Sequence, residues 1–131
     1  MKSNVLFLLV AMIFCHIVDD YYLQGILAKL KQKSWWKENA PDKMYKNDYK
    51  VALIEHAFSW SVMVHIPVFI YCYLNALNAH NSFILIMLVQ TIVHALIDDL
   101  KANKKVISLL EDQLTHMAQI FLSWMICLIL M

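Results

Sequence analysis

The sequence predicts an all-α protein: a four-transmembrane-helix antiparallel bundle with a cytoplasmic interfacial segment between helices 1 and 2. Apolar residues make up 61% of the 131 residues, against about 45–50% in soluble domains. The single glycine and two prolines supply few of the turns that a sheet requires. Four apolar segments each approach the ~20 residues that cross a bilayer as a helix. One integral membrane domain, residues 1–131, accommodates all of them.

The predicted spans cover residues 4–24, 51–77, 82–100 and 106–131. The first begins behind Met1-Lys2, a charged start that it shares with cleaved secretory signals. No small-x-small cleavage site follows, so we expect this span to be retained. Because only residues 101–105 separate the third span from the fourth, these two should be antiparallel neighbours.

Lysine placement predicts the orientation of the spans. All eleven basic residues are lysine, and ten of them lie within residues 29–50 or 101–105. The opposite connection, residues 75–81, contains no lysine, and we expect its His80 to be solvated. By the positive-inside rule the two charged loops are cytoplasmic, and both termini lie outside.

The segment from Gly25 to Lys50 is basic and rich in tryptophan and tyrosine. We expect it to lie partly along the membrane surface as a helix and a turn, broken at Pro41. It then either contacts anionic lipid or substrate headgroups or serves as a solvated anchor. Nucleic acid is not an expected partner, because the chain has no arginine to bind phosphates or base edges bidentately.

Polar residues recur at helical spacing within the spans. Side chains at positions i, i+4 and i+8 share one face of a helix. The first span carries His16, Asp20 and Gln24, the second Glu55 and His56, the third Gln90, His94, Asp98 and Lys101, and the fourth Asp112, Gln113 and His116. Every span therefore brings an imidazole, and three of them add a carboxylate on the same stripe.

These side chains are predicted to share one depth. At a rise of about 1.5 Å per residue, one residue of each span lies about 7–9 Å below the cytoplasmic boundary: His16, His56, His94 and Asp112. His116 lies about one turn deeper. An acid that faced lipid would cost about 2.5–3.5 kcal/mol, so we expect these groups to face one another inside the bundle.

Imidazole and carboxylate together are ligands of zinc, iron and manganese. We predict one or two divalent metal ions between the facing helices, zinc first, with iron or manganese as alternatives. The predicted ligands are His16, Asp20, His56, His94, Asp98, Asp112 and His116. The alternative is a hydrogen-bonded polar contact between helices that holds no metal.

The remaining polar residues have supporting roles in this prediction. Three acids beside the stripes are candidate general bases: Asp19, Asp99 and Glu55. Four residues should orient ligands or bind substrate: Gln24, Gln90, Gln113 and Lys101. For Lys101 the alternatives are an ion pair with Asp98 and snorkelling toward the headgroups. His65 falls on the helix face opposite His56, close to Pro67, and we expect it to serve packing or a kink.

Several motifs resemble those of domain-of-unknown-function family 3307, which comprises small bacterial and phage membrane proteins. Residues 16–24 resemble its H-x-x-x-D-[FY]-x-L-Q signature, residues 94–101 its H-x-x-x-D-x-x-K element, and residues 112–116 its D-Q-x-x-H element. His56 stands where the family has an isolated histidine. The doubled acids Asp19-Asp20 and Asp98-Asp99 depart from the pattern and leave open which carboxylate of each pair binds. The resemblance covers nearly the whole chain and implies a bacterial inner-membrane protein, without implying an activity.

The leading functional hypothesis is a membrane-embedded metal-dependent hydrolase that acts on a phosphate ester or related bond of a lipid or lipid-linked substrate. The His/Asp pattern also resembles, more distantly, that of predicted membrane-bound metal-dependent hydrolases. The alternatives are a metal or proton transporter, a non-catalytic membrane protein with a structural polar or metal layer, and a redox di-iron enzyme. Membrane lipids and the substrate are the expected partners. The sequence leaves the oligomeric state open, and a homo-oligomer is compatible with it.

Overall fold

The computed structural model describes residues 2–77 and 81–131, so the prediction for His80 lies outside the described residues. The described chain is helical apart from turns and connections, which confirms the all-α class. Its elements are α1 (Lys2–Val18), the π-helical turn η1 (Asp19–Leu23), α2 (Leu27–Leu30), α3 (Lys33–Asn39), the 3-10 turn η2 (Lys43–Tyr45), α4 (Asp48–Leu74), α5 (Asn81–Ala102) and α6 (Leu109–Leu130). Four helical segments are long and apolar enough to cross a membrane: Val5–Leu23, Lys43–Leu74, Asn81–Ala102 and Leu109–Leu130.

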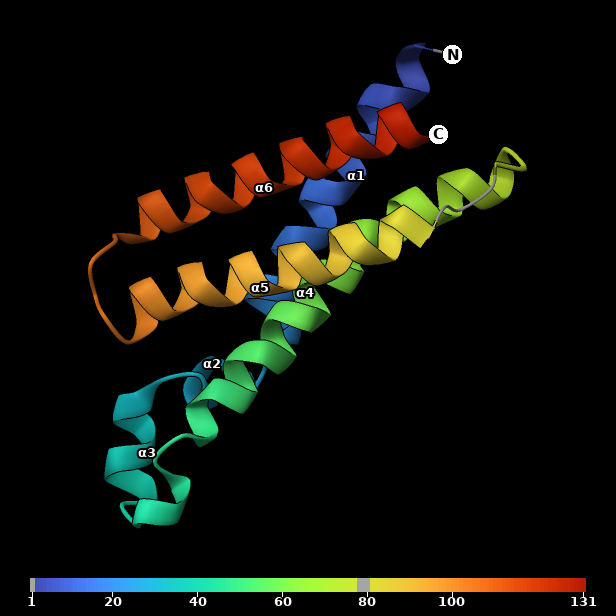
Figure 1. Ribbon diagram of the computed structural model, residues 1–131. Coiled ribbons are helices and arrows are strands. Elements are labelled where there is room, and N and C mark those ends of the chain that lie inside the picture. Colours follow the sequence, from blue (N-terminus) through green and yellow to red (C-terminus); the bar gives the residue numbers. More distant parts are fainter. Residues whose placement is uncertain (1, 78–80) are drawn as a thin grey trace.

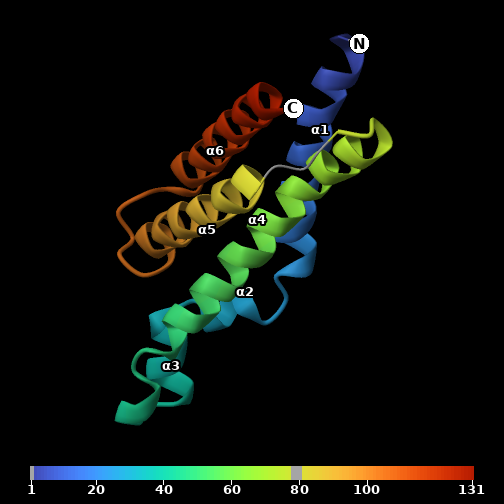
Figure 2. The ribbon, with the colours of Figure 1, turned by 45° about the vertical axis from the view of Figure 1, so that its right-hand side comes forward.

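The four long helices form a ring in which each packs against two others. α4 packs against α1 and α5, and α6 packs against α5 and α1. Figure 1 shows α5 and α6 side by side and running in opposite directions, as their short connection predicts. Figure 2 shows α4 between α1 and α5. The interior of this ring is where inward-facing side chains of all four helices can meet.

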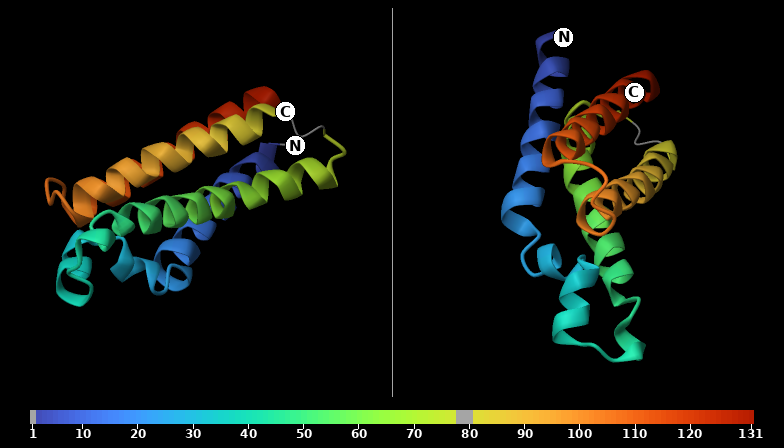
Figure 3. Two further views of the ribbon diagram at one scale, coloured as in Figure 1. Left: turned by 60° about the horizontal axis from the view of Figure 1, so that its bottom comes forward. Right: turned by 90° about the vertical axis from the view of Figure 1, so that its left-hand side faces the viewer.

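The two ends of the molecule differ in what they carry. Both termini and the C-terminal end of α4 lie at one end, whereas α2, α3 and the α5–α6 connection lie at the other (Figure 3). This grouping is the one that the lysine pattern predicts, since the lysine-rich segments gather at a single end. α3 ends at Asn39, just ahead of Pro41, whose ring is incompatible with a continuing helix.

Apolar side chains cover both the outside of the long helices and one half of the interior. Outside, Phe7 is 72% and Tyr73 85% exposed, an arrangement suited to contact with lipid. Inside, a buried apolar cluster fills the half of the bundle nearer the termini and includes Leu8, Met12, Val64, Val68, Phe83 and Ile120. Trp60 belongs to the same cluster. It lies at the end of the cluster that meets the polar layer, the set of side chains formed by His16, Asp20, His56, His94, Asp98, Asp112 and His116.

α6 begins three residues later than the predicted span because of its cap. The Ser108 hydroxyl accepts from the backbone N–H of Glu111, and the Glu111 carboxylate accepts from the backbone N–H of Ser108 at 2.7 Å. This capping box satisfies two N–H groups that the first turn of a helix leaves without partners. The helix therefore starts at Leu109, about one turn before Asp112.

Gly25 ends the first span by turning the chain. Its φ of +49° lies in the left-handed region, where a side chain costs about 1–2 kcal/mol. We expect Gly25→Ala to lower the free energy of unfolding by about 1 kcal/mol, measured as a lower midpoint in thermal unfolding in detergent. Gly25→Asn is the control, because asparagine tolerates this conformation. Equal stability of the two variants would contradict this account of the turn.

Candidate metal centre

Seven predicted ligands come together in the interior, at the end of the bundle that carries α2. They come from every long helical segment: His16 from α1, Asp20 from η1, His56 from α4, His94 and Asp98 from α5, and Asp112 and His116 from α6. The four histidines are at most 1% exposed, and Asp112 is fully buried. The rings of His94 and His116 stack with their centroids 4.2 Å apart. The shared depth inferred from helical rise thus corresponds to a shared place.

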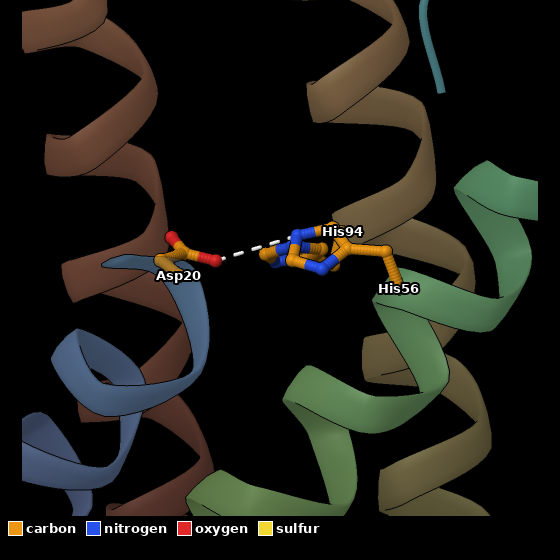
Figure 4. A group of neighbouring side chains, drawn as sticks. All are labelled: Asp20, His56 and His94. Carbon is orange, nitrogen blue, oxygen red and sulfur yellow. Dashed lines mark hydrogen bonds and ion pairs between the residues drawn. The ribbon is translucent and has the colours of Figure 1, made fainter. Parts of the chain in front are cut away.

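Two groups of three side chains have the proximity that a metal ion requires. The first comprises Asp20, His56 and His94. His56 Nε2 lies 3.3 Å from Asp20 Oδ1 and 3.3 Å from His94 Nε2. Figure 4 shows the Asp20 carboxylate directed across the interior toward the two rings. The three side chains come from η1, α4 and α5, so these three segments must pack together to assemble the group.

The second group comprises His94, Asp98 and His116. Asp98 Oδ1 lies 3.6 Å from His116 Nε2 and 3.9 Å from His94 Nε2. Asp112 Oδ1 adjoins this group at 3.3 Å from His116 Nε2. Both groups include His94, and an imidazole nitrogen has one lone pair. His94 Nε2 can therefore serve one of the two groups at a time.

The separations between donor atoms fit a metal's coordination sphere better than direct hydrogen bonds. Ligands at 2.0–2.2 Å in tetrahedral array around zinc lie about 3.3–3.6 Å from one another. Hydrogen bonds between N–H and oxygen are usually about 2.7–3.2 Å long. Within the two groups, His56 lies 3.3 Å from Asp20 and 3.3 Å from His94, and Asp98 lies 3.6 Å from His116 and 3.9 Å from His94. These contacts are long for hydrogen bonds, and all but the last match ligand-to-ligand spacing.

Several atoms of the layer that could bind a metal lack any hydrogen-bond partner among the described residues. They include Asp20 Oδ1, Asp112 Oδ1 and His116 Nε2, all buried. Buried polar atoms are nearly always satisfied in folded proteins, and a group of exceptions calls for an explanation. A cation in the first group would satisfy Asp20 Oδ1, and one beside the second group would satisfy His116 Nε2 and Asp112 Oδ1, so the residues present fit a divalent metal ion.

His16 differs from the other three histidines of the layer. Trp60 Nε1 donates to His16 Nδ1 at 2.7 Å, and His16 Nε2 lies 3.2 Å from Gln113 Oε1. The first contact places the lone pair on Nδ1, so Nε2 carries the proton and donates to Gln113. Both nitrogens are engaged, and His16 belongs to neither group of three. In this arrangement His16 is hydrogen-bonded to Trp60 and Gln113, and its Nδ1 lies 3.4 Å from Asp20 Oδ2 without a proton to donate to it.

His116 is held in the orientation that a ligand needs. Its Nδ1 lies 3.1 Å from Gln119 Oε1. Because a glutamine oxygen only accepts, Nδ1 carries the proton and Nε2 keeps its lone pair toward the acids. Gln119 in turn donates to Gln90 Oε1 at 2.7 Å, and Gln90 donates to Ser123 Oγ at 2.8 Å. Gln90 therefore contacts His116 through Gln119 and orients it.

A π-helical turn explains why both acids of the first pair reach the interior. η1 spans Asp19–Leu23, and the backbone N–H of Gln24 donates to the carbonyl of Asp19 at 3.0 Å. The sequence pattern predicts a regular α-helical stripe through Gln24, so this wider turn is a departure from it. Such turns insert one residue and often occur at functional sites. Asp19 is fully buried as a result, and Asp20 reaches His56.

The three candidate general bases occupy different surroundings. Asp19 accepts from Ser59 Oγ at 2.7 Å and lies 3.8 Å from His56 Nδ1. Asp99 lies outside the layer, paired with Lys104 at 3.2 Å. Glu55 is exposed on α4. Of these acids, Asp19 is the one that the structure brings beside the candidate ligands, and for Asp99 and Glu55 the location does not suit the predicted role.

The other predicted supporting residues lie on the side of the layer that faces α2. Gln24 donates to the backbone carbonyl of Asp20, and Gln113 bridges His16 and Asp112. Lys101 donates to Asp112 Oδ2 at 2.6 Å. The predicted alternative, an ion pair of Lys101 with Asp98, is not found there, because Lys31 occupies Asp98 Oδ2 at 2.6 Å.

Sequence reasoning missed Lys31, Gln119 and Trp60. Trp60 stacks on His94 with ring centroids 4.2 Å apart. It follows His56 by four residues and so lies on the same helix face, which means that the sequence spacing could have identified it. Gln119 follows His116 by three residues and could have been found in the same way. Lys31 had no such signal, because its approach to Asp98 depends on how α2 folds back against the bundle.

Comparison with known proteins adds no relative: no family model, no curated protein and no solved structure matches the chain. The resemblance to family 3307 therefore stays a prediction that rests on the motifs alone.

Proposed function

We propose that the chain is a membrane-embedded, metal-dependent hydrolase whose His/Asp site lies near the cytoplasmic face. Its proposed substrate is a phosphate ester or a related bond in a lipid or lipid-linked molecule. In this proposal α1, α4, α5 and α6 cross the inner membrane of a bacterium, α2 and α3 lie at its cytoplasmic surface, and both termini are outside. The lysine distribution supports this orientation.

The spacing of the donor atoms carries the proposal. Imidazole nitrogens and carboxylate oxygens from three or more helices lie 3.3–3.9 Å apart, and three of these atoms, Asp20 Oδ1, Asp112 Oδ1 and His116 Nε2, have no hydrogen-bond partner among the described residues. A hydrogen-bonded lock between helices would bring the same groups to about 2.7–3.2 Å. Zinc is the first candidate, because its ligands are nitrogen and oxygen at tetrahedral spacing.

The site has the components that metal-assisted hydrolysis uses. A bound divalent ion lowers the pKa of its water and polarises the bond to be cleaved. Asp19 is the proposed general base, since it lies beside His56 without belonging to either group of three. The proposed ligands are His94 with either Asp20 and His56 or Asp98 and His116. Asp112 lies beside the second of these groups.

The apolar half of the bundle interior favours a hydrolase over a metal or proton transporter. A conducting path needs polar groups that continue across the membrane. Toward the termini the buried side chains are mostly apolar, such as Met12, Val64 and Ile120, and the buried polar residues His65 and Ser123 follow Val64 and Ile120 by one and three positions. The layer is thus a vestibule closed on its outer side, and protein reconstituted in liposomes should show no metal flux.

Elemental analysis of detergent-purified protein tests the proposal first. We expect zinc or another divalent ion at one per chain, because both candidate groups depend on His94. Treatment with a chelator should abolish hydrolysis of phosphate-ester lipids presented in mixed micelles, and added metal should restore it. Protein that purifies without metal and takes up none during dialysis would overturn the proposal.

A further inference from the structure

A pocket opens on the α2 side of the candidate metal centre. It has a volume of about 360 Å³ and is lined by Gln24, Lys31, Gln32, Asp98, Lys101 and Ala102. A smaller cavity of about 70 Å³ adjoins it and shares Gln24, Lys31, Asp98 and Lys101. The smaller cavity adds Asp20 and Asp112 to the lining. The surface pocket and the smaller cavity thus share four lining side chains, and the Asp98 carboxylate lines both.

Two lysines line both cavities, and each donates a hydrogen bond to one oxygen of a carboxylate in the layer. Lys31 donates to Asp98 Oδ2 and Lys101 to Asp112 Oδ2, both at 2.6 Å. The other oxygens, Oδ1 of each acid, face His116 Nε2 at 3.6 and 3.3 Å. Each acid can therefore offer Oδ1 to a metal while its lysine keeps the carboxylate in place.

Both ammonium groups keep donors for a further acceptor. An ammonium group has three N–H donors, and within the described residues each lysine donates to a single carboxylate oxygen. The side chain of Lys31 is 14% exposed and that of Lys101 35%. The buried amide oxygen of Gln24, beside them in the lining, has no partner among the described residues. The pocket thus presents unused polar groups to whatever enters it.

The two lysines offset two of the three acids that line the smaller cavity, since Lys31 pairs with Asp98 and Lys101 with Asp112, while Asp20 has no lysine partner there. Without the lysines, these acids would repel a phosphate at this entrance. The remaining N–H donors of the two ammonium groups can make charge-assisted hydrogen bonds to phosphate oxygens. The chain has no arginine, so lysine supplies the permanently charged donors at this pocket. An anion held here would lie next to Asp98 and Asp112, at the edge of the candidate metal centre.

We propose that Lys31 and Lys101 form a phosphate-binding subsite at the entrance of the metal centre and position an anionic phosphate group of the substrate. This inference rests on the proposed function and specifies its substrate class. A lipid phosphate headgroup and free inorganic phosphate present the same chemistry to the two lysines.

Three charge-neutralising variants test the subsite. Lys31→Gln and Lys101→Gln each remove one ammonium of the pair. Lys104→Gln is the matched control, because Lys104 is an exposed lysine at the same end of α5 that pairs with Asp99. The metal content of every protein is measured first by elemental analysis, and inorganic phosphate is then titrated calorimetrically into the metal-loaded protein in detergent.

We expect Lys31→Gln and Lys101→Gln to keep the wild-type metal content and to weaken phosphate binding about tenfold each. Lys104→Gln should bind phosphate as the wild type does. Titration with a short-chain phosphatidic acid distinguishes the two sources, since tighter binding than that of inorganic phosphate would assign a lipid headgroup.

Three results would overturn the subsite: wild-type phosphate affinity in both test variants, an equal loss in Lys104→Gln, or loss of metal in both test variants. The last would assign the lysines to orienting the acids alone. Titration of chelator-treated protein keeps this inference separate from the metal proposal. Lysine-dependent phosphate binding by protein that never holds metal would support the subsite while overturning the hydrolase.

Discussion

His94→Ala is expected to abolish metal binding and hydrolysis together. His94 is common to both groups of candidate ligands, and its Nε2 lies 3.3 Å from His56 Nε2 and 3.9 Å from Asp98 Oδ1. Loss of an orienting partner already costs up to about 100-fold in metal affinity. Loss of a shared ligand should cost at least that, measured by competition with a chromophoric chelator.

His65→Ala is the control for the structural cost of removing a buried histidine. His65 lies on α4, is 1% exposed, and its Nδ1 contacts the carbonyl of Ser61 at 2.7 Å. It belongs to neither metal group. Both substitutions leave a cavity of similar size, so both should lower the unfolding midpoint, but only His94→Ala should lose the ion. Equal metal content in the two variants would refute the assignment of His94.

Much of the layer could be predicted because it depends on two regularities of helices. The i, i+4 spacing of His94 with Asp98, and of Asp112 with His116, sets their common face. The rise per residue then sets their common depth. Neither regularity requires knowledge of how the helices pack, provided that polar groups within apolar spans turn inward.

What escaped prediction depends on departures from the regular helix and on tertiary packing. The π-helical turn at Asp19 is not visible in a pattern read at α-helical periodicity, yet it decides that both Asp19 and Asp20 are directed inward. The hydrogen bond from Trp60 to His16 could not be inferred from spacing on one helix, because the two residues lie 44 positions apart in the chain. Helical spacing alone therefore identified His16 as a member of the layer without identifying its hydrogen-bonded role.

The second large effect is expected at the doubled acid of α5, where two neighbouring carboxylates have different surroundings. Asp98 is 4% exposed and contacts three histidines, at 3.4 Å from His56, 3.6 Å from His116 and 3.9 Å from His94. Asp99 points away from the layer and pairs with Lys104 and Asn103. The sequence alone could not choose between them, and the structure favours Asp98.

Asp98→Asn and Asp99→Asn make this choice measurable, since each removes one negative charge and almost no volume. We expect Asp98→Asn to lower metal affinity by at least about 100-fold, more than the loss of an outer partner, and to leave the Lys31 ammonium without its counter-ion. Asp99→Asn should keep both metal and hydrolysis, because an exposed ion pair contributes at most about 1 kcal/mol. If Asp99→Asn lost the ion instead, the second carboxylate would be the ligand, and α5 would have to be rotated by one residue about its axis relative to His56 and His116.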